Sequence, residues 1–108
     1  MATKPQQKVL VVDDEEPILE LLRYNLEKQG YDVKTAIDGS VGVEIARKFH
    51  PDLVLLDIMM PRMDGVEACR LLRAMPELQN TFIVFLTARS EEYSEVAAFD
   101  VGADDYIT

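Results

Sequence analysis

The chain has 108 residues, which is enough for one domain that buries a core without disulfides or a structural metal. Its hydrophobic content of 48% and charged content of 29% are typical of a soluble globular protein, and no apolar run approaches the length of a membrane span. Eleven basic against twenty acidic residues give a net charge of −9, which argues against direct binding of this segment to nucleic acid.

Single cysteine and histidine residues narrow the chemistry further. Cys69 is alone, so an internal disulfide and a cysteine-cluster metal site are excluded, and its helical spacing from Val66 and Leu72 indicates a small core residue. His50, the only histidine, stands before Pro51 in a predicted loop and is expected to be structural, so we predict neither a histidine-based catalytic triad nor a zinc site. The start, "MATKPQQK", lacks the apolar segment of a signal peptide, so we expect a cytoplasmic protein with no membrane contact.

The first half of the chain alternates between strand and helix patterns. "KVLVVD" (8–13) is an apolar run that ends in acid, and a helix follows from Pro17 to a stop at Gly30. "YDVKTA" (31–36) alternates as an edge strand does, and Asp38-Gly39 predicts a turn. A second helix is then predicted with Val41, Ile45 and Phe49 on one face, ending before Pro51.

The second half repeats this alternation. "LVLLD" (53–57) predicts a strand that is buried on both faces, and "TFIVFLT" (81–87) predicts another. Between them lies a helix that carries Val66, Cys69 and Leu72. A fourth helix is predicted from Ser90 to Gly102, and "DDYIT" (104–108) predicts a short last strand. Such alternation indicates an α/β fold whose parallel sheet has helices on both faces, with ligands at the carboxyl ends of the strands.

Acidic side chains stand where two of these strands end. Asp13 and Asp14 follow the first strand, and Asp57 closes the third. If the two strands are neighbours, the carboxylates lie about 4.8 Å apart and repel one another by roughly 3 kcal/mol at an effective dielectric near 20. A hard divalent cation relieves this repulsion, and ligands that are all oxygen favour Mg²⁺. The alternative for Asp13 and Asp14 is a helix cap, which the second acidic strand end disfavours.

These positions also suit phosphoryl transfer. An aspartate beside Mg²⁺ can act as a nucleophile towards phosphorus and form an acyl phosphate. Thr87, at the end of the fourth strand, can donate its hydroxyl to a phosphoryl oxygen, although a strand-end threonine that merely caps the next turn is an equal alternative.

The motifs "VLVVDDEE", "LLDIMMPRMDG", "FLTAR" and "GADDYIT" together resemble the receiver (CheY-like) domain of two-component response regulators. The last two are most similar to the winged-helix, DNA-binding subfamily (OmpR/PhoB-type). The resemblance covers about residues 8–108. It implies a flavodoxin-like doubly wound sheet of five parallel strands in the order 2-1-3-4-5, in one receiver domain, 1–108, whose effector domain lies outside this sequence.

The resemblance also implies roles at matching positions. Asp57 is similar to the phospho-accepting aspartate, Asp14 to the direct Mg²⁺ ligand, and Asp13 to a ligand that acts mainly through water. Met59 would lend its backbone carbonyl to Mg²⁺. Thr87 and Tyr106 resemble the pair that moves on phosphorylation; for Tyr106 the alternative is an edge-strand tyrosine half on the surface.

One departure from the family concerns the carboxyl end. The family lysine that pairs with the phosphoryl group, and the fifth helix after it, would follow Thr108, so we expect a truncated receiver domain that lacks both. Family dimers use the fourth helix, fifth strand and fifth helix, which implies a homodimer through that face. In this chain the fourth helix is acidic, with Glu91, Glu92 and Glu95, and the fifth is missing.

Three functions follow from these observations. The first is a Mg²⁺-dependent regulatory domain, not a turnover enzyme, in which a histidine kinase phosphorylates Asp57 and the fourth-helix and fifth-strand face then controls a transcriptional output. The second is a pseudo-receiver that acts as an interaction module without phosphorylation. The third is an aspartate-nucleophile phosphatase, which is disfavoured because that chemistry places a second acid where this chain has Met59.

Overall fold

The computed structural model describes residues 6–58, 63–86 and 102–107, with the backbone alone for Tyr106 and Ile107. Strands and helices alternate along the chain, as predicted. The elements are β1 (Lys8–Val12), α1 (Glu16–Lys28), β2 (Asp32–Ala36), α2 (Gly39–Phe49), β3 (Leu53–Asp57), α3 (Gly65–Arg73), the short 3-10 helix η1 (Pro76–Leu78), β4 (Phe82–Leu86) and β5 (Asp105–Ile107). The predicted fourth helix, 90–102, lies almost entirely outside the described residues.

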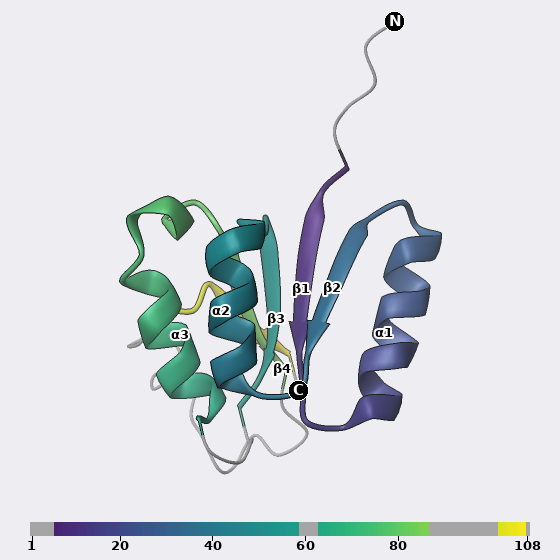
Figure 1. Ribbon diagram of the computed structural model, residues 1–108, viewed down its shortest axis with the longest axis horizontal. Helices are drawn as coiled ribbons and strands as arrows, with labels where there is room; N and C mark the ends of the chain where they lie inside the picture. The colour runs from purple at the N-terminus through teal and green to yellow at the C-terminus, as the bar shows by residue number, and fades with distance from the viewer. Residues whose placement is uncertain (1–5, 59–62, 87–101, 108) are drawn as a thin grey trace, which may run out of the picture.

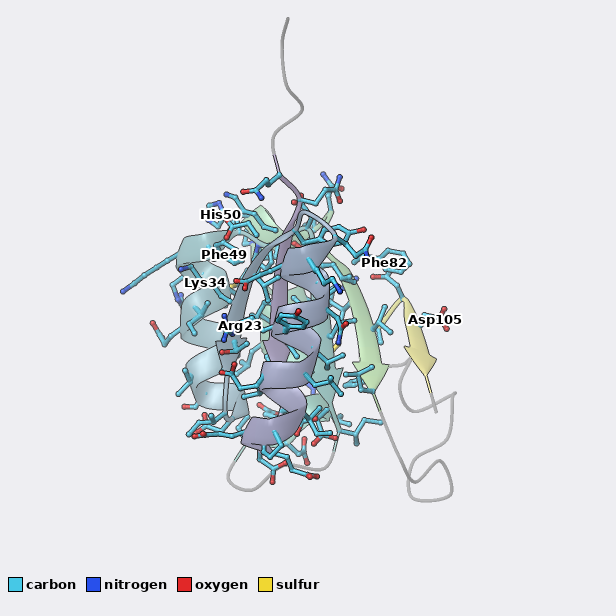
Figure 2. All side chains as sticks on the ribbon, turned by 90° about the vertical axis from the view of Figure 1, so that its right-hand side faces the viewer. Arg23, Lys34, Phe49, His50, Phe82 and Asp105 are labelled. Atoms are coloured by element: carbon cyan, nitrogen blue, oxygen red, sulfur yellow. The ribbon has the colours of Figure 1, made fainter. Side chains whose placement is uncertain are left out.

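All five strands form one parallel sheet in the order β2-β1-β3-β4-β5, which confirms the predicted fold. Figure 1 shows α2 and α3 on one face of this sheet and α1 on the other. Seen at right angles in Figure 2, α1 lies across the front of the strands. Within the described ranges, no helix has both the length and the apolar character that crossing a bilayer would need.

Successive side chains of β1 point to opposite faces of the sheet, and the core is therefore divided into two clusters. Leu10 and Val12 of β1 pack on the α2 and α3 face, whereas Val9 and Val11 pack on the α1 face. All four side chains are almost fully buried, because β1 is covered on both faces. This explains why the sequence of β1 is continuously apolar.

Close approach of helix and strand fixes where α2 lies. A Cβ atom added to Gly42 would stand 2.8 Å from Cγ2 of Val12, so only glycine lets the helix backbone approach β1 this closely. The side chain of Asp38 accepts a hydrogen bond of 2.9 Å from the backbone N–H of Val41 and so caps the helix. The predicted turn at residues 38–39 is therefore the start of α2.

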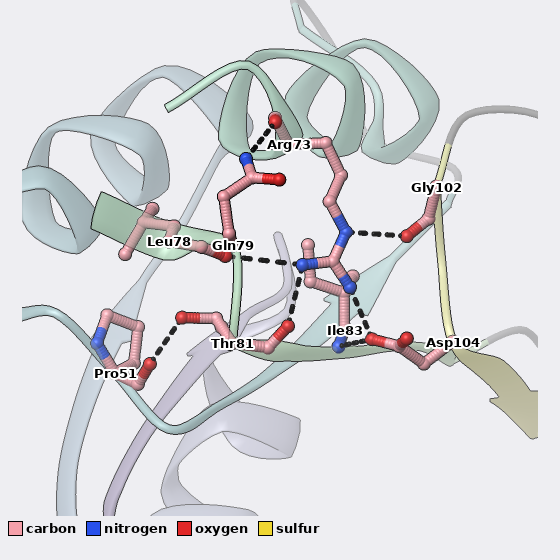
Figure 3. Close-up of polar contacts among 8 residues, drawn as sticks. All are labelled: Pro51, Arg73, Leu78, Gln79, Thr81, Ile83, Gly102 and Asp104. Atoms are coloured by element: carbon pink, nitrogen blue, oxygen red, sulfur yellow. Dashed lines mark hydrogen bonds and ion pairs between the residues drawn. The ribbon is translucent and has the colours of Figure 1, made fainter. Parts of the chain in front are cut away.

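A guanidinium network joins α3 to the amino ends of β4 and β5 (Figure 3). Arg73 donates from Nε to the carbonyl of Gly102 at 2.7 Å and from Nη1 to the carbonyl of Thr81 at 2.7 Å, and its Nη2 forms an ion pair with Asp104. The carboxylate of Asp104 also accepts from the backbone N–H of Ile83 at 2.8 Å. One arginine therefore fixes where the chain enters β5.

Candidate functional site

Three carboxylates meet at the carboxyl ends of β1 and β3. Asp13 and Asp14 directly follow β1, and Asp57 is the last residue of β3, the adjacent parallel strand. One oxygen from each of these side chains lies within 4.8 Å of the other two. The structure thus brings together the acids that the strand ends predicted to meet, and we call this group the acidic corner.

The buried member of the acidic corner is Asp13, with 7% of its surface exposed. Its Oδ1 accepts a hydrogen bond of 2.9 Å from the backbone N–H of Glu15, and its own N–H donates to the carbonyl of Ala36 at 3.1 Å. Glu15 is the N-cap residue of α1, and α1 has no side-chain capping bond. The helix-cap alternative for Asp13 and Asp14 is therefore not what the structure shows.

Electrostatics distinguish Asp13 from an ordinary carboxyl group. Burial raises its pKa, and the neighbouring negative charges of Asp14 and Glu15 raise it further, while the hydrogen bond from Glu15 acts in the opposite direction. The raised pKa means that the ionised form is held at a cost in the metal-free protein. A cation beside this side chain would remove that cost.

Gly65, the first residue of α3, lies very close to the end of β3. A Cβ atom on Gly65 would lie 2.1 Å from the carbonyl oxygen of Asp57, so any other residue would push the end of β3 aside. Gly65 also donates its N–H to the carbonyl of Ile58 at 2.9 Å. Next to it, the side chain of Asp64 caps α3 by accepting from the N–H of Glu67 at 2.9 Å. Neither Gly65 nor Asp64 was predicted to shape the site, although "DG" before an amphipathic helix is a typical start signal.

The side chains of the other predicted site residues lie outside the part of the chain that the structure describes. Met59 and Thr87 lie outside the described residues. Tyr106 lies in β5, where its backbone pairs in register with Phe85 of β4, but its side chain is also outside them. The roles of these residues, and of the three aspartates, stay predictions.

The donor set of the acidic corner fits Mg²⁺. It offers only carboxylate oxygens, one buried, one partly buried and one exposed, so a bound ion would keep access to solvent on one side. Hard oxygen ligands of this kind suit Mg²⁺, which retains several waters, better than zinc. The residues present therefore fit the cofactor that the sequence implies.

This sheet order, with acids at the ends of the adjacent interior strands β1 and β3, is that of a class of signalling domain. The family model of the response regulator receiver domain matches residues 9–108, and the chain belongs to this family. It is thus a receiver domain of the two-component type, as the motifs predicted.

Individual relatives agree with this assignment. The chain is 49% identical over 102 residues to the alkaline phosphatase synthesis transcriptional regulatory protein PhoP of Bacillus subtilis, covering 94% of this chain and 42% of PhoP. It therefore spans about two fifths of that curated relative. Likeness to a transcriptional regulator agrees with the predicted DNA-binding subfamily.

Solved structures show the same fold. The chemotaxis protein CheY4 of Vibrio cholerae superposes with a TM-score of 0.89 at 31% identity, over 96% of this chain and 87% of that one. The response regulator TrrA of Thermotoga maritima, solved in complex with Mg²⁺-BeF, gives a TM-score of 0.84 at 35% identity, over 95% and 86% of the two chains.

Proposed function

We propose that Asp57 accepts a phosphoryl group from a histidine kinase in a Mg²⁺-dependent reaction, and that the modified domain then controls a transcriptional output. The meeting of three carboxylate oxygens within 4.8 Å carries this proposal. A phosphoryl group adds further negative charge to the acidic corner, so phosphorylation of Asp57 is favourable there only when a cation is bound. The chain acts as a regulatory domain and not as an enzyme with turnover on a separate substrate.

Asp57 is the nucleophile of the proposed reaction. One of its carboxylate oxygens attacks phosphorus, the bond from phosphorus to the donor's imidazole nitrogen breaks, and the imidazole keeps the electron pair. The product is an acyl phosphate on Asp57. The position at the very end of β3, partly buried, lets a donor reach this side chain while the strand holds its backbone in place.

Asp13 and Asp14 would hold the cation. Asp14 is exposed and offers direct ligation, whereas buried Asp13 has one oxygen engaged by Glu15 and would act mainly through water. The backbone carbonyl of Met59 completes the proposed set. When bound, Mg²⁺ neutralises charge on the transferred phosphoryl oxygens.

Thr87 and Tyr106 would transmit the change. In this proposal the hydroxyl of Thr87 donates to a phosphoryl oxygen, and Tyr106 follows by moving inward. The covalent group thereby shifts a two-state equilibrium of the surface formed by the fourth helix and β5. That surface would also carry a homodimer contact.

A docking surface for the kinase lies beside the acidic corner. Four large apolar side chains on α1, on α2 and between β2 and α2 are more than a third exposed: Ile18 and Leu21 of α1, Ile37 after β2, and Val41 in the first turn of α2. Ile37 follows Ala36, whose carbonyl bonds Asp13, so this surface adjoins the carboxylates. Exposed apolar groups around a polar centre mark protein interaction sites.

Domain context extends the proposal. We take residues 1–108 as one receiver domain of a cytoplasmic regulator whose DNA-binding effector domain lies outside this sequence. PhoP, the relative described above, is a transcriptional regulator more than twice as long as the matched part. Contact with DNA would then come from the effector domain, because the present chain carries a net charge of −9.

Mass spectrometry tests the proposal directly. The protein is incubated with acetyl phosphate and Mg²⁺, and we expect its mass to rise by that of one phosphoryl group. No such rise should occur when EDTA is present during the incubation, or in Asp57→Asn. Asp32→Asn, a change at an exposed acid away from the acidic corner, should keep the gain in full. An unchanged mass with Mg²⁺ present, or a phosphoryl group retained in Asp57→Asn, would contradict the proposal. An unchanged mass together with no saturable Mg²⁺ binding in a titration would instead favour the pseudo-receiver.

A further inference from the structure

A cavity lies at the β2 edge of the sheet, away from the acidic corner. It has a volume of about 580 Å³ and is bounded by β2, α1 and α2. Figure 2 shows Arg23, Lys34 and Phe49 on this side of the molecule, whereas Phe82 and Asp105 mark the opposite side. Phe49 ends α2, so the cavity reaches towards the amino ends of the strands.

The charge of the cavity opposes that of the chain. Arg23, Lys34 and Lys48 line it, and none of its lining side chains is acidic, although the chain as a whole carries −9. Arg23 already forms ion pairs with glutamates of its own helix. Within the described part of the chain, Lys34 and Lys48 form no ion pair, so both ammonium groups are available to an anion.

Beneath these charges the cavity is apolar. Val33 and Phe49 are buried, Ile45 is half-buried, and all three line it. The Nζ of Lys34 lies 5.3 Å from the centre of the Phe49 ring, which places the ammonium group directly over the apolar floor. A ligand that fits both features has apolar groups and negative charges in close alternation.

An open strand edge forms one wall. β2 is the first strand of the sheet and pairs with β1 alone. The N–H of Asp32 donates to the carbonyl of Gln7, next to β1, so the period of two directs the N–H groups of Val33 and Thr35 away from β1. Both of these residues line the cavity. Within residues 6–58, 63–86 and 102–107 no strand pairs with this edge, so the two N–H groups can pair with an added strand.

We propose that this cavity binds an extended acidic segment of a partner protein, which adds to the edge of β2 as a further strand. Alternate side chains of the segment would place carboxylates on the α2 face of the sheet, near Lys34 and Lys48, and apolar groups on the α1 face, near Val33. A second copy of this chain is a poor occupant, because pairing β2 with itself would bring the two Lys34 side chains together.

Fluorescence anisotropy with two matched peptides tests charge recognition. One labelled peptide alternates glutamate and valine over about eight residues, a typical strand length, and the other has lysine for each glutamate. We expect saturable binding of the acidic peptide by the full chain and at least a tenfold weaker affinity for the basic one. Equal affinity for both peptides, or no saturable binding of the acidic peptide, overturns the proposal.

Charge reversal locates the site. The double change Lys34→Glu with Lys48→Glu should weaken binding of the acidic peptide by about tenfold or more. Lys28→Glu alters an exposed lysine of α1 that does not line the cavity and should leave the affinity within about twofold. If a double-stranded DNA oligonucleotide competes more strongly than the peptide for the same lysines, the cavity is a phosphate site and the proposal is wrong.

Amide hydrogen exchange tests the added strand. Peptide binding should slow exchange at Val33 and Thr35 while leaving the amide of Lys34, which already points to β1, unchanged. Thr35→Pro removes one N–H donor that points away from β1, so it should weaken peptide binding. The variant should still fold, because proline is tolerated on edge strands. Binding without protection of Val33 and Thr35 would refute strand addition, even if Thr35→Pro fails to fold.

Discussion

Neutralising Asp13 tests whether the acidic corner is held at a cost to stability. The three carboxylate oxygens lie within 4.8 Å of one another, and two unit charges at that separation repel by roughly 3 kcal/mol at an effective dielectric of 20. Solvent at exposed Asp14 screens much of this repulsion. In Asp13→Asn the oxygen that accepts from Glu15 is retained, so little else changes. We expect the metal-free variant to be more stable than the parent chain by about 1–2 kcal/mol.

Urea unfolding in EDTA and in Mg²⁺ measures the effect. At a Mg²⁺ concentration about 100 times the dissociation constant, the parent chain gains about 2.7 kcal/mol; if Asp13→Asn binds about 100-fold more weakly, it gains only about 0.4 kcal/mol. The order of stability therefore reverses when Mg²⁺ is added. Asp32→Asn serves as the matched control and should show no reversal. A metal-free Asp13→Asn that unfolds at a lower urea concentration than the parent chain would refute the reasoning.

The pH dependence has a defined sign. Because the folded-state pKa of Asp13 is raised, the folded chain binds more protons than the unfolded chain between the two pKa values. The contribution of this group is therefore present at pH values below its ordinary pKa of 3.8 and is lost as the pH rises through the raised value. The metal-free parent chain should show this loss in urea midpoints across that window, and Asp13→Asn should not.

Three further predictions concern positions around the sheet. Gly65→Ala should lower the free energy of unfolding in urea by about 3 kcal/mol, because the added Cβ would meet the backbone of Asp57. The control Gly30→Ala has open space but a φ of +97°, and it should cost about 1 kcal/mol. Equal costs would contradict the close approach of Gly65 to β3. Arg73→Ala should lower the free energy of unfolding by about 2–4 kcal/mol, because it removes the hydrogen bonds to Gly102 and Thr81. Arg70→Ala removes only an exposed ion pair within α3 and should cost at most about 0.5 kcal/mol. Similar thermal midpoints for the two variants would count against the network. The Cys69 thiol, whose pKa burial raises to about 11, should react with an aromatic disulfide reagent at pH 8 only as fast as the chain unfolds; rapid labelling of the native protein would show that it is accessible.

Strand positions were predictable because burial on both faces leaves a simple pattern. The run at 53–57 was predicted with the observed bounds of β3, since an apolar stretch closed by an acid has a clear beginning and end. The start of α2 was missed, because residues 38–39 were predicted to be a turn. Gly39 and Gly42 suggest a turn in the sequence, but the approach of Gly42 to Val12 depends on tertiary packing that local patterns do not contain.

The candidate site was predictable to the extent that it follows strand ends. Asp13 and Asp57 each directly follow or close an apolar run, and parallel strands bring such ends to one edge of the sheet. The Arg73 network and the cavity at β2 gave no such signal. Arg73 meets Asp104 across 31 positions of sequence, and Lys34 meets Phe49 from a different element, so neither pairing has a local spacing to detect.

Placement of the carboxylates on interior strands has a consequence for local opening. β1 and β3 each have a hydrogen-bonded strand on both sides, so their backbones can separate only when most of the sheet comes apart. Fluctuations that expose a helix end or the β2 edge leave the spacing between Asp13 and Asp57 unchanged. The distance between Asp13 and Asp57 is therefore maintained by the cooperative folding of the entire domain. A destabilising substitution deep in either core cluster should impair the site even though the substituted residue does not contact it.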